Sequence, residues 1–133
     1  MEVIDHENIE IVVSYLETCG MPTLAEVNEQ QMAGIWVVLQ HAHPEYQRKY
    51  IPLLEESARS GDIEWPAIAL MKDRALMYEV KPQVYGSQVS NDTLYDLEDP
   101  EYVDQRRAAI GMEPLKDYLQ YFGIDFIIEQ KTK

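Results

Sequence analysis

Polar side chains recur in apolar surroundings along this chain, and these are the residues whose types could perform chemistry. Burying a polar group is costly unless it has a partner, so each one indicates either a pocket or a shared internal network. In a pocket, His41 would be a general base, Asp73 would orient it or carry a proton, and Arg74 would hold an anion. The candidate ligand-binding residues are Gln40, Gln47, Arg74, Gln83, Tyr85, Gln88 and Arg106.

Asp73 is the strongest candidate because the residues three and four positions from it are apolar. Those residues are Ala69, Leu70, Leu76 and Met77. An ionised carboxylate in such surroundings needs a cation or several hydrogen-bond donors. Arg74 follows directly, but adjacent residues on a helix do not face one another. Asp73 therefore needs a partner elsewhere, such as Arg106, Arg107 or His41. The alternative is an ion-pair network that only holds helices together.

The histidines and the single cysteine do not form a metal-binding pattern. His41 and His43 are two residues apart and so lie on different sides of a helix end, unlike the four-residue spacing of zinc-binding helices. His41 could instead be a cation that the helix dipole favours. Cys19 is alone, which excludes an internal disulfide. No phosphate-binding glycine loop or nucleophile elbow is present, so we expect neither a metal nor a cofactor.

Charge limits the classes of partner. The 133 residues include 24 acidic and 11 basic ones, which gives a formal net charge of -13. Nucleic acids and anionic membranes are therefore poor partners, because both bind clustered Lys and Arg. The acidic surface would suit a basic protein partner, or it serves solubility alone. The N-terminus lacks the features of a signal peptide, and no window approaches the ~18 apolar residues of a membrane span, so we expect a cytoplasmic protein.

Periodic apolar residues and helix-end signals predict a mostly helical chain that forms a single domain over residues 1–133. Thr23 and Glu26 form a capping-box pattern at the start of the second helix, and Asp99 is the expected cap of the fifth. Pro52 predicts a kink or a break in the third helix. The predicted helices cover about residues 6–19, 23–42, 44–60, 65–78, 99–111 and 114–122.

Residues 82–98 differ from the rest because they are rich in Gly, Pro, Ser and Asn. This composition favours a loop or a small hairpin around Ser90–Asp92. Its polar side chains either recognise a ligand or hold the loop to the core by hydrogen bonds. Residues 124–128 would form a short strand or a docked tail. The predicted fold class is all-α: a compact five- to six-helix domain with a short irregular or hairpin insertion.

The polar residues together resemble those of an uncharacterised bacterial family. Its members carry Trp, then Gln-His-Ala, a Gln, Asp-Arg, Gln-x-Tyr-Gly-Thr-Gln, and a basic pair before Gly. The matching residues here are Trp36, Gln40–Ala42, Gln47, Asp73-Arg74, Gln83, Tyr85–Gln88 and Arg106-Arg107 before Gly111. The match spans about residues 20–118, with Met21 where Gly-Trp-Pro is usual and Ser87 where Thr is usual. The resemblance implies no activity.

Two classes of function remain. One is a pocket in which the polar residues bind a small ligand, such as an anion held by Arg74, or act on it. The other is an acidic protein-interaction module or inhibitor of a basic protein, in which the polar residues are purely structural. Its surface would be Asp92, Asp96, Glu98, Asp99, Glu101 and Asp104. A cavity with exposed Gln40, His41 and Asp73 would favour the pocket, whereas mutually satisfied side chains would favour the module.

Overall fold

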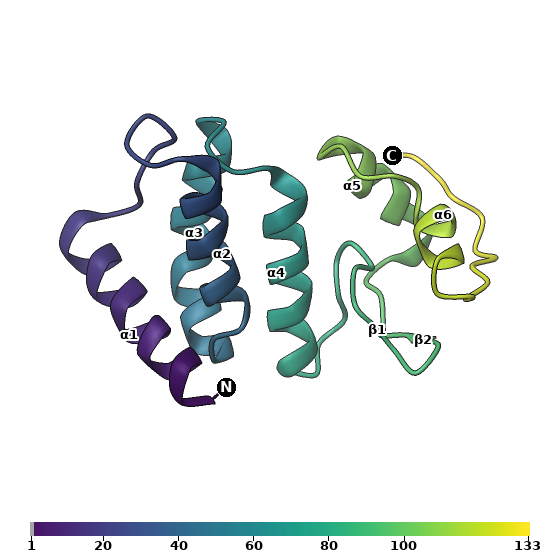
Figure 1. Cartoon of the computed structure of the whole chain (residues 1–133). Helices are drawn as coiled ribbons and strands as arrows, with labels where there is room; N and C mark the ends of the chain where they lie inside the picture. Colours follow the sequence, from purple (N-terminus) through teal and green to yellow (C-terminus); the bar gives the residue numbers. More distant parts are fainter. Residues whose placement is uncertain (1) are drawn as a thin grey trace. The chain divides into compact units, whose positions relative to one another are not determined.

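The computed structural model describes residues 2–133, and the side chains of residues 7–133. Six α-helices, one short 3-10 helix and one two-stranded sheet make up the regular structure of the described residues, which confirms the predicted all-α class with a hairpin insertion (Figure 1). The chain divides into two compact units, Met1–Ala67 and Ile68–Lys133. We describe each unit by itself; a single domain over the whole chain stays a prediction.

The first unit contains the helices α1 (Glu2–Cys19), α2 (Glu29–Gln40) and α3 (Pro44–Arg59), and α2 contacts both of the others. Amphipathic spacing is clearest in α3, where buried residues recur every three or four positions from Gln47 to Ala58. The buried apolar residues of the three helices are Leu16, Met32, Leu39, Tyr50, Ile51, Leu54 and Ala58.

The second helix begins later than predicted. The Thr23 hydroxyl and the Glu26 carboxylate do meet, at 3.1 Å, but they close only one turn, in which the Val27 amide donates to the Thr23 carbonyl. The helix itself starts at a second capping box. There the Asn28 side chain accepts from the Gln31 amide at 2.8 Å, and the Gln31 side chain accepts from the Asn28 amide at 3.0 Å. Two competing caps within six residues explain the error.

The third helix continues through Pro52, so of the two predicted alternatives the break is wrong and the kink stays a prediction. Pro44 occupies its first turn, where the missing amide hydrogen costs nothing, and His43 caps it by accepting from the Glu45 amide at 3.3 Å. Pro52 itself is exposed. The helix buries apolar side chains on both sides of the proline, and this packing holds the two halves in one helix.

The helix α4 (Trp65–Tyr78) has the predicted bounds, and its residues from Ile68 onward belong to the second unit. A hairpin follows, with β1 (Val89–Ser90) antiparallel to β2 (Thr93–Leu94). The two turn residues, Asn91 and Asp92, have φ of 50° and 61°. Positive φ at both positions is typical of the type I′ turn that matches strand twist, and the predicted hairpin is confirmed.

The predicted helix over residues 99–111 forms two shorter pieces. These are the 3-10 helix η1 (Pro100–Tyr102) and the α-helix α5 (Val103–Ala109). Asp99 is not a side-chain cap as expected: its φ is 37°, and its side chain makes no capping hydrogen bond. A cap requires an extended backbone, and the left-handed conformation of Asp99 points its side chain elsewhere.

The last helix, α6 (Leu115–Gln120), starts just after Pro114. It buries Leu115 and Leu119 with Val103 of α5 in the apolar core of the second unit. Ile124 and Phe126 pack against this core, so the segment after α6 is a docked tail and not a strand. None of the helices in the described part of the chain is both long and apolar enough to cross a membrane.

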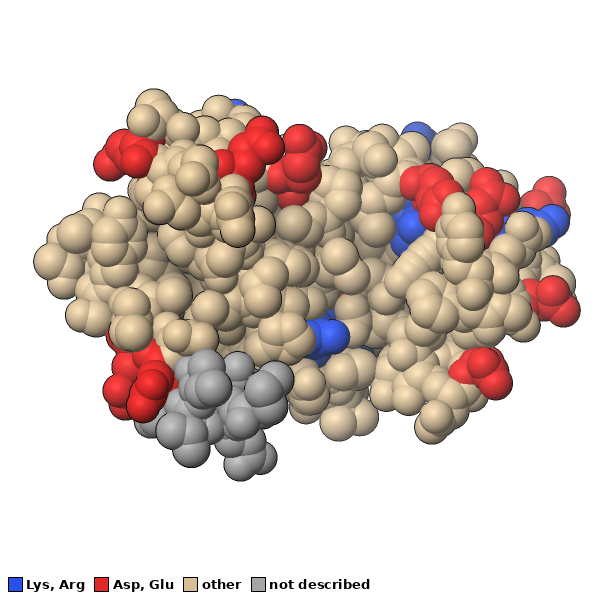
Figure 2. All heavy atoms as spheres, in the orientation of Figure 1, with Lys and Arg blue, Asp and Glu red and all other residues tan. Residues whose placement is uncertain are grey.

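Acidic side chains are more widespread than basic ones on the face drawn in Figure 2. This distribution agrees with the net charge of -13.

Candidate functional site

Asp73 lies at the centre of the polar residues of the second unit. It is fully buried in α4, at 0% exposure, and its carboxylate accepts four hydrogen bonds from the loop that follows. Oδ1 accepts from the amides of Val84 (2.8 Å) and Tyr85 (3.1 Å). Oδ2 accepts from the amide (3.0 Å) and the hydroxyl (2.8 Å) of Ser87. The donors are therefore loop groups and not the cations that the sequence suggested as partners.

Two arginines hold the carbonyl groups of the same loop. Arg106 donates from Nε to the Val84 carbonyl at 2.8 Å, and its other nitrogens donate to the carbonyls of Glu98 and Asp99. Arg107 donates from Nη1 to the Tyr85 carbonyl at 2.6 Å. The loop is thus bound through its amides by one carboxylate and through its carbonyls by two guanidinium groups.

Arg107 is the largest buried polar side chain of this cluster, at 1% exposure. Its Nε donates to the Glu113 carbonyl at 2.6 Å, and its guanidinium lies 5.1 Å from the ring centroid of Tyr118. Burial lowers the pKa of Arg107 and raises the pKa of Tyr118. The Tyr118 hydroxyl donates to the Ser87 carbonyl at 2.9 Å. Tyr118 was not predicted, because nothing in its local sequence separates it from other helical tyrosines.

The two glutamines at the ends of the loop close it. The Gln83 amide group donates to the carbonyls of Gln88 (3.0 Å) and Tyr95 (3.1 Å), and its oxygen accepts from the Gln88 amide at 2.9 Å. The Gln88 side chain donates to the Ser87 hydroxyl at 3.1 Å and to the Leu70 carbonyl at 3.4 Å. We call residues 83–88, with Asp73, Arg106, Arg107 and Tyr118, the loop network.

The loop network brings together five of the predicted site residues, which are Asp73, Gln83, Tyr85, Gln88 and Arg106. Tyr85 takes part through its backbone. Both oxygens of Asp73 are occupied by loop donors, so the arrangement can fix a loop conformation but presents no unoccupied carboxylate oxygen to a substrate. The sixth predicted residue of the second unit, Arg74, is half-buried in α4.

The other predicted residues, Gln40, His41 and Gln47, belong to the first unit. Gln47 is fully buried, at 0% exposure, and its Nε2 lies within hydrogen-bond distance of three carbonyls at the end of α2. The nearest is the Gln40 carbonyl, at 2.8 Å. The Gln47 oxygen is buried and has no hydrogen-bond partner in the described chain. His41 is the exposed C-cap of α2. A catalytic pairing of His41 with Asp73 stays a prediction.

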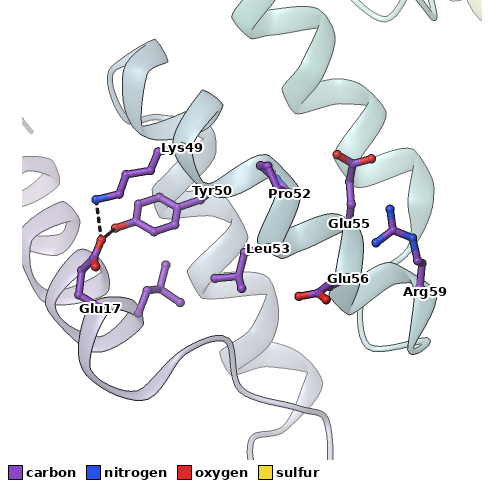
Figure 3. A pocket seen from close by; sticks show the side chains of 9 residues that line it. Glu17, Lys49, Tyr50, Pro52, Leu53, Glu55, Glu56 and Arg59 are labelled. Carbon is purple, nitrogen blue, oxygen red and sulfur yellow. Dashed lines mark hydrogen bonds and ion pairs between the residues drawn. The ribbon is translucent and has the colours of Figure 1, made fainter.

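A hollow of about 590 Å³, lined by both acidic and basic side chains, lies between α1 and α3 (Figure 3). At one end of it the Glu17 carboxylate accepts from the Tyr50 hydroxyl at 2.7 Å and pairs with the Lys49 ammonium at 2.6 Å. The hydrogen bond from Lys49 is the main reason that the pKa of Glu17 is lowered, and the same bond raises the pKa of Lys49. The negative charge of Glu17 is thus already balanced by Lys49, within the same unit.

An apolar groove of about 340 Å³ lies beside Trp36, also in the first unit. Gln83 is one of the residues around a third hollow, of about 550 Å³, at the hairpin of the second unit. In the described part of the chain, no group of three or more His, Cys, Asp or Glu side chains lies close enough to hold a metal ion. The side chain of His6 lies outside the described residues.

Comparison with curated proteins and with solved structures finds no match. A family model described as "Family of unknown function (DUF6624)" matches residues 1–130. This match agrees with the expected resemblance to an uncharacterised family, although it does not test the individual motif residues. The chain therefore belongs to the family of unknown function DUF6624.

Proposed function

We propose that this protein is a protein-interaction module that recognises a basic partner through an acidic segment, residues 92–104. The observation that carries the proposal is the contrast between two sets of polar side chains in the second unit. The side chains of the loop network form their hydrogen bonds with groups of the second unit itself, which supports a structural role. The carboxylates of Asp92, Asp96, Glu98 and Asp99 are exposed.

The acidic segment contains no Lys or Arg. Arg106, the first base after it, directs its hydrogen bonds to backbone carbonyls and not to these carboxylates. Asp104 differs from the others because its Oδ1 accepts from the Leu115 amide at 2.8 Å and so holds the start of α6. The exposed carboxylates therefore produce a negative field that would speed the approach of a basic protein.

The proposal is tested with a triple variant, Asp92→Asn, Asp96→Asn and Glu98→Gln. A matched control removes three exposed acids elsewhere in the second unit, Asp117→Asn, Asp125→Asn and Glu129→Gln. Association with a Lys/Arg-rich peptide is measured at low and high salt. The acidic-segment variant should bind several-fold more slowly at low salt than the control, because nearby charges set the encounter rate. Equal rates for the two variants would contradict the proposal.

One observation favours a second candidate, a small polar ligand bound in the first unit. The buried oxygen of Gln47 lacks a hydrogen-bond partner, and unpartnered buried acceptors are rare in folded proteins. The Nε2 atom of the same side chain contacts the carbonyls of Gln40 and Ala42, on either side of His41. A thermal-shift screen of small polar compounds, repeated on His41→Ala, tests this. Hits that the variant loses would support the site; a screen with no hit shared by repeat preparations would count against it.

A further inference from the structure

The apolar groove beside Trp36 is built from segments that are far apart in the sequence. Its apolar lining residues are Leu24, Met32, Ala33, Trp36, Ile63 and Ala67. Two hydrogen bonds fix its walls. The Trp36 indole donates to the Ala67 carbonyl at 2.9 Å, and the Leu24 amide donates to Asp62 Oδ1 at 3.0 Å. The groove is therefore preformed, which lowers the entropy that binding would cost.

The charged residues around the groove are all acidic. They are Glu29, Asp62 and Glu64, and the described lining includes no Lys, Arg or His. Asp62 is engaged by the Leu24 amide, whereas Glu29 and Glu64 are exposed. The groove thus presents an apolar floor and a negative rim.

We infer that this groove binds a segment of a partner protein in which a large apolar side chain is flanked by Lys or Arg. Its volume of about 340 Å³ is near the lower end of ligand pockets, so it fits one or two large side chains and not a folded surface. Apolar anchors in preformed pockets carry most of the binding energy of such contacts, and complementary charges around them set orientation and rate. The groove lies in the first unit, so the inference does not depend on the acidic segment.

The hollow between α1 and α3 does not offer the same chemistry. Its lining includes Lys49 and Arg59 beside its carboxylates, and its Glu17 is already bonded to Lys49 and Tyr50 (Figure 3). The groove beside Trp36 combines an apolar floor with rim carboxylates of which two are exposed. This combination selects a cationic, amphipathic segment over an acidic or a purely polar one.

The fluorescence of Trp36 reports directly on binding in the groove. The chain contains two tryptophans, so a Trp65→Phe background makes Trp36 the single indole. The probe is a synthetic helical peptide with Leu and Lys at four-residue spacing. Two matched peptides replace its Leu by Ser or its Lys by Glu. The Leu/Lys peptide should shift the Trp36 emission and bind more tightly than both matched peptides.

Two pairs of variants locate the binding. Ala33→Leu fills the groove, and Ala108→Leu adds the same volume at an exposed helical position of the second unit. Glu29→Gln with Glu64→Gln removes rim charge, and Asp125→Asn with Glu129→Gln removes the same charge elsewhere. Ala33→Leu should weaken the Leu/Lys peptide about tenfold or more, and the rim variant about threefold with a smaller salt dependence, whereas both controls bind normally.

Several results would overturn the inference. An Ala33→Leu variant that keeps its circular dichroism spectrum and binds the peptide normally would place the peptide elsewhere. If the Lys peptide that lacks Leu bound equally well, the net charge of the protein alone would explain the binding, without the groove. Failure of the acidic-segment test would leave this experiment unaffected, because none of its variants lies in residues 92–104.

Discussion

Asp73 and Ser87 are joined twice. The Oδ2 atom of Asp73 accepts from the Ser87 amide at 3.0 Å and from its hydroxyl at 2.8 Å, while Oδ1 binds the amides of Val84 and Tyr85. One side chain of α4 therefore fixes both sides of the turn around Gly86. A carboxylate is suited to this task because it has two oxygens that only accept. The turn would lose its main anchor if that carboxylate were removed.

Gly86→Ala should destabilise the protein more than Gly111→Ala. Both glycines have positive φ, 77° and 80°, which costs alanine about 1 kcal/mol. At Gly86 an added Cβ would also lie 2.8 Å from Leu115 Cδ1, and Leu115 is fully buried, so its side chain would have to shift within the core. Overpacking of this kind costs a further 1–3 kcal/mol or so. Urea denaturation of the two variants measures the difference; equal losses would contradict the close packing.

Ser87→Ala should cost about 1–2 kcal/mol, because it removes the hydroxyl donor to a buried carboxylate. Ser87→Thr keeps that donor and should lose less. Thermal melts of both variants against the wild-type protein provide the comparison. A Thr variant that is less stable than the Ala variant would show that volume, and not the hydrogen bond, decides at this buried position.

Glu17 should make the first unit sensitive to acid. Its pKa is lowered from the ordinary value of 4.5 by the hydrogen bonds from Lys49 and then Tyr50. A lowered pKa in the folded state means that Glu17 stabilises the fold above pH 4.5 and loses this contribution as the pH falls through the folded value. Melting temperatures from neutral to acidic pH, for Glu17→Gln and for Glu45→Gln as a control, measure the contribution. The Glu17→Gln variant should lose part of the acid dependence that Glu45→Gln keeps.

The raised pKa values of Lys49 and Tyr50 predict that the fold also loses stability at high pH. Hydrogen bonding to Glu17 raises the pKa of Lys49 above 10.5, and burial raises the pKa of Tyr50 above 10.0. A raised pKa in the folded state means that these groups stabilise the fold at neutral pH and lose their contribution as the pH rises through the folded values. In an absorbance titration against the wild-type protein, Tyr50→Phe should remove one of the tyrosines that ionise above the ordinary pKa of 10.0, and should leave the raised pKa of Tyr118 in place. Loss of a tyrosine with an ordinary pKa from the titration would contradict the Tyr50–Glu17 hydrogen bond.

Local patterns in the sequence were sufficient for the elements that depend on local chemistry. The bounds of α4 and the hairpin around Asn91-Asp92 follow from apolar periodicity and turn residues, and the structure confirms both. The start of α2 was wrong because two capping boxes compete within a few residues, and only packing decides which one carries the helix. The cap expected at Asp99 was wrong because its backbone is left-handed.

The partners of Asp73 could not be predicted from residue types. Its charge in an apolar helix correctly indicated burial and several bonds, but the bonds come mainly from backbone amides. Every residue except proline carries such an amide, so the sequence does not mark which loop will supply them. For the same reason, the sequence does not indicate that Arg107 binds the Tyr85 carbonyl. The predicted catalytic and ligand-binding roles are not tested by this geometry.

The most direct test of the structural role of the loop network compares Asp73→Asn with Asp73→Ala, with Asp125→Asn as an exposed control, by equilibrium urea denaturation. Asn replaces one acceptor oxygen by an amide group that faces loop donors, so we expect a loss of about 1–3 kcal/mol. Ala leaves all of these donors without an acceptor and should lose about 3 kcal/mol or more. An Asp73→Asn variant as stable as the wild-type protein, or more stable, would contradict the account and indicate a functional carboxylate.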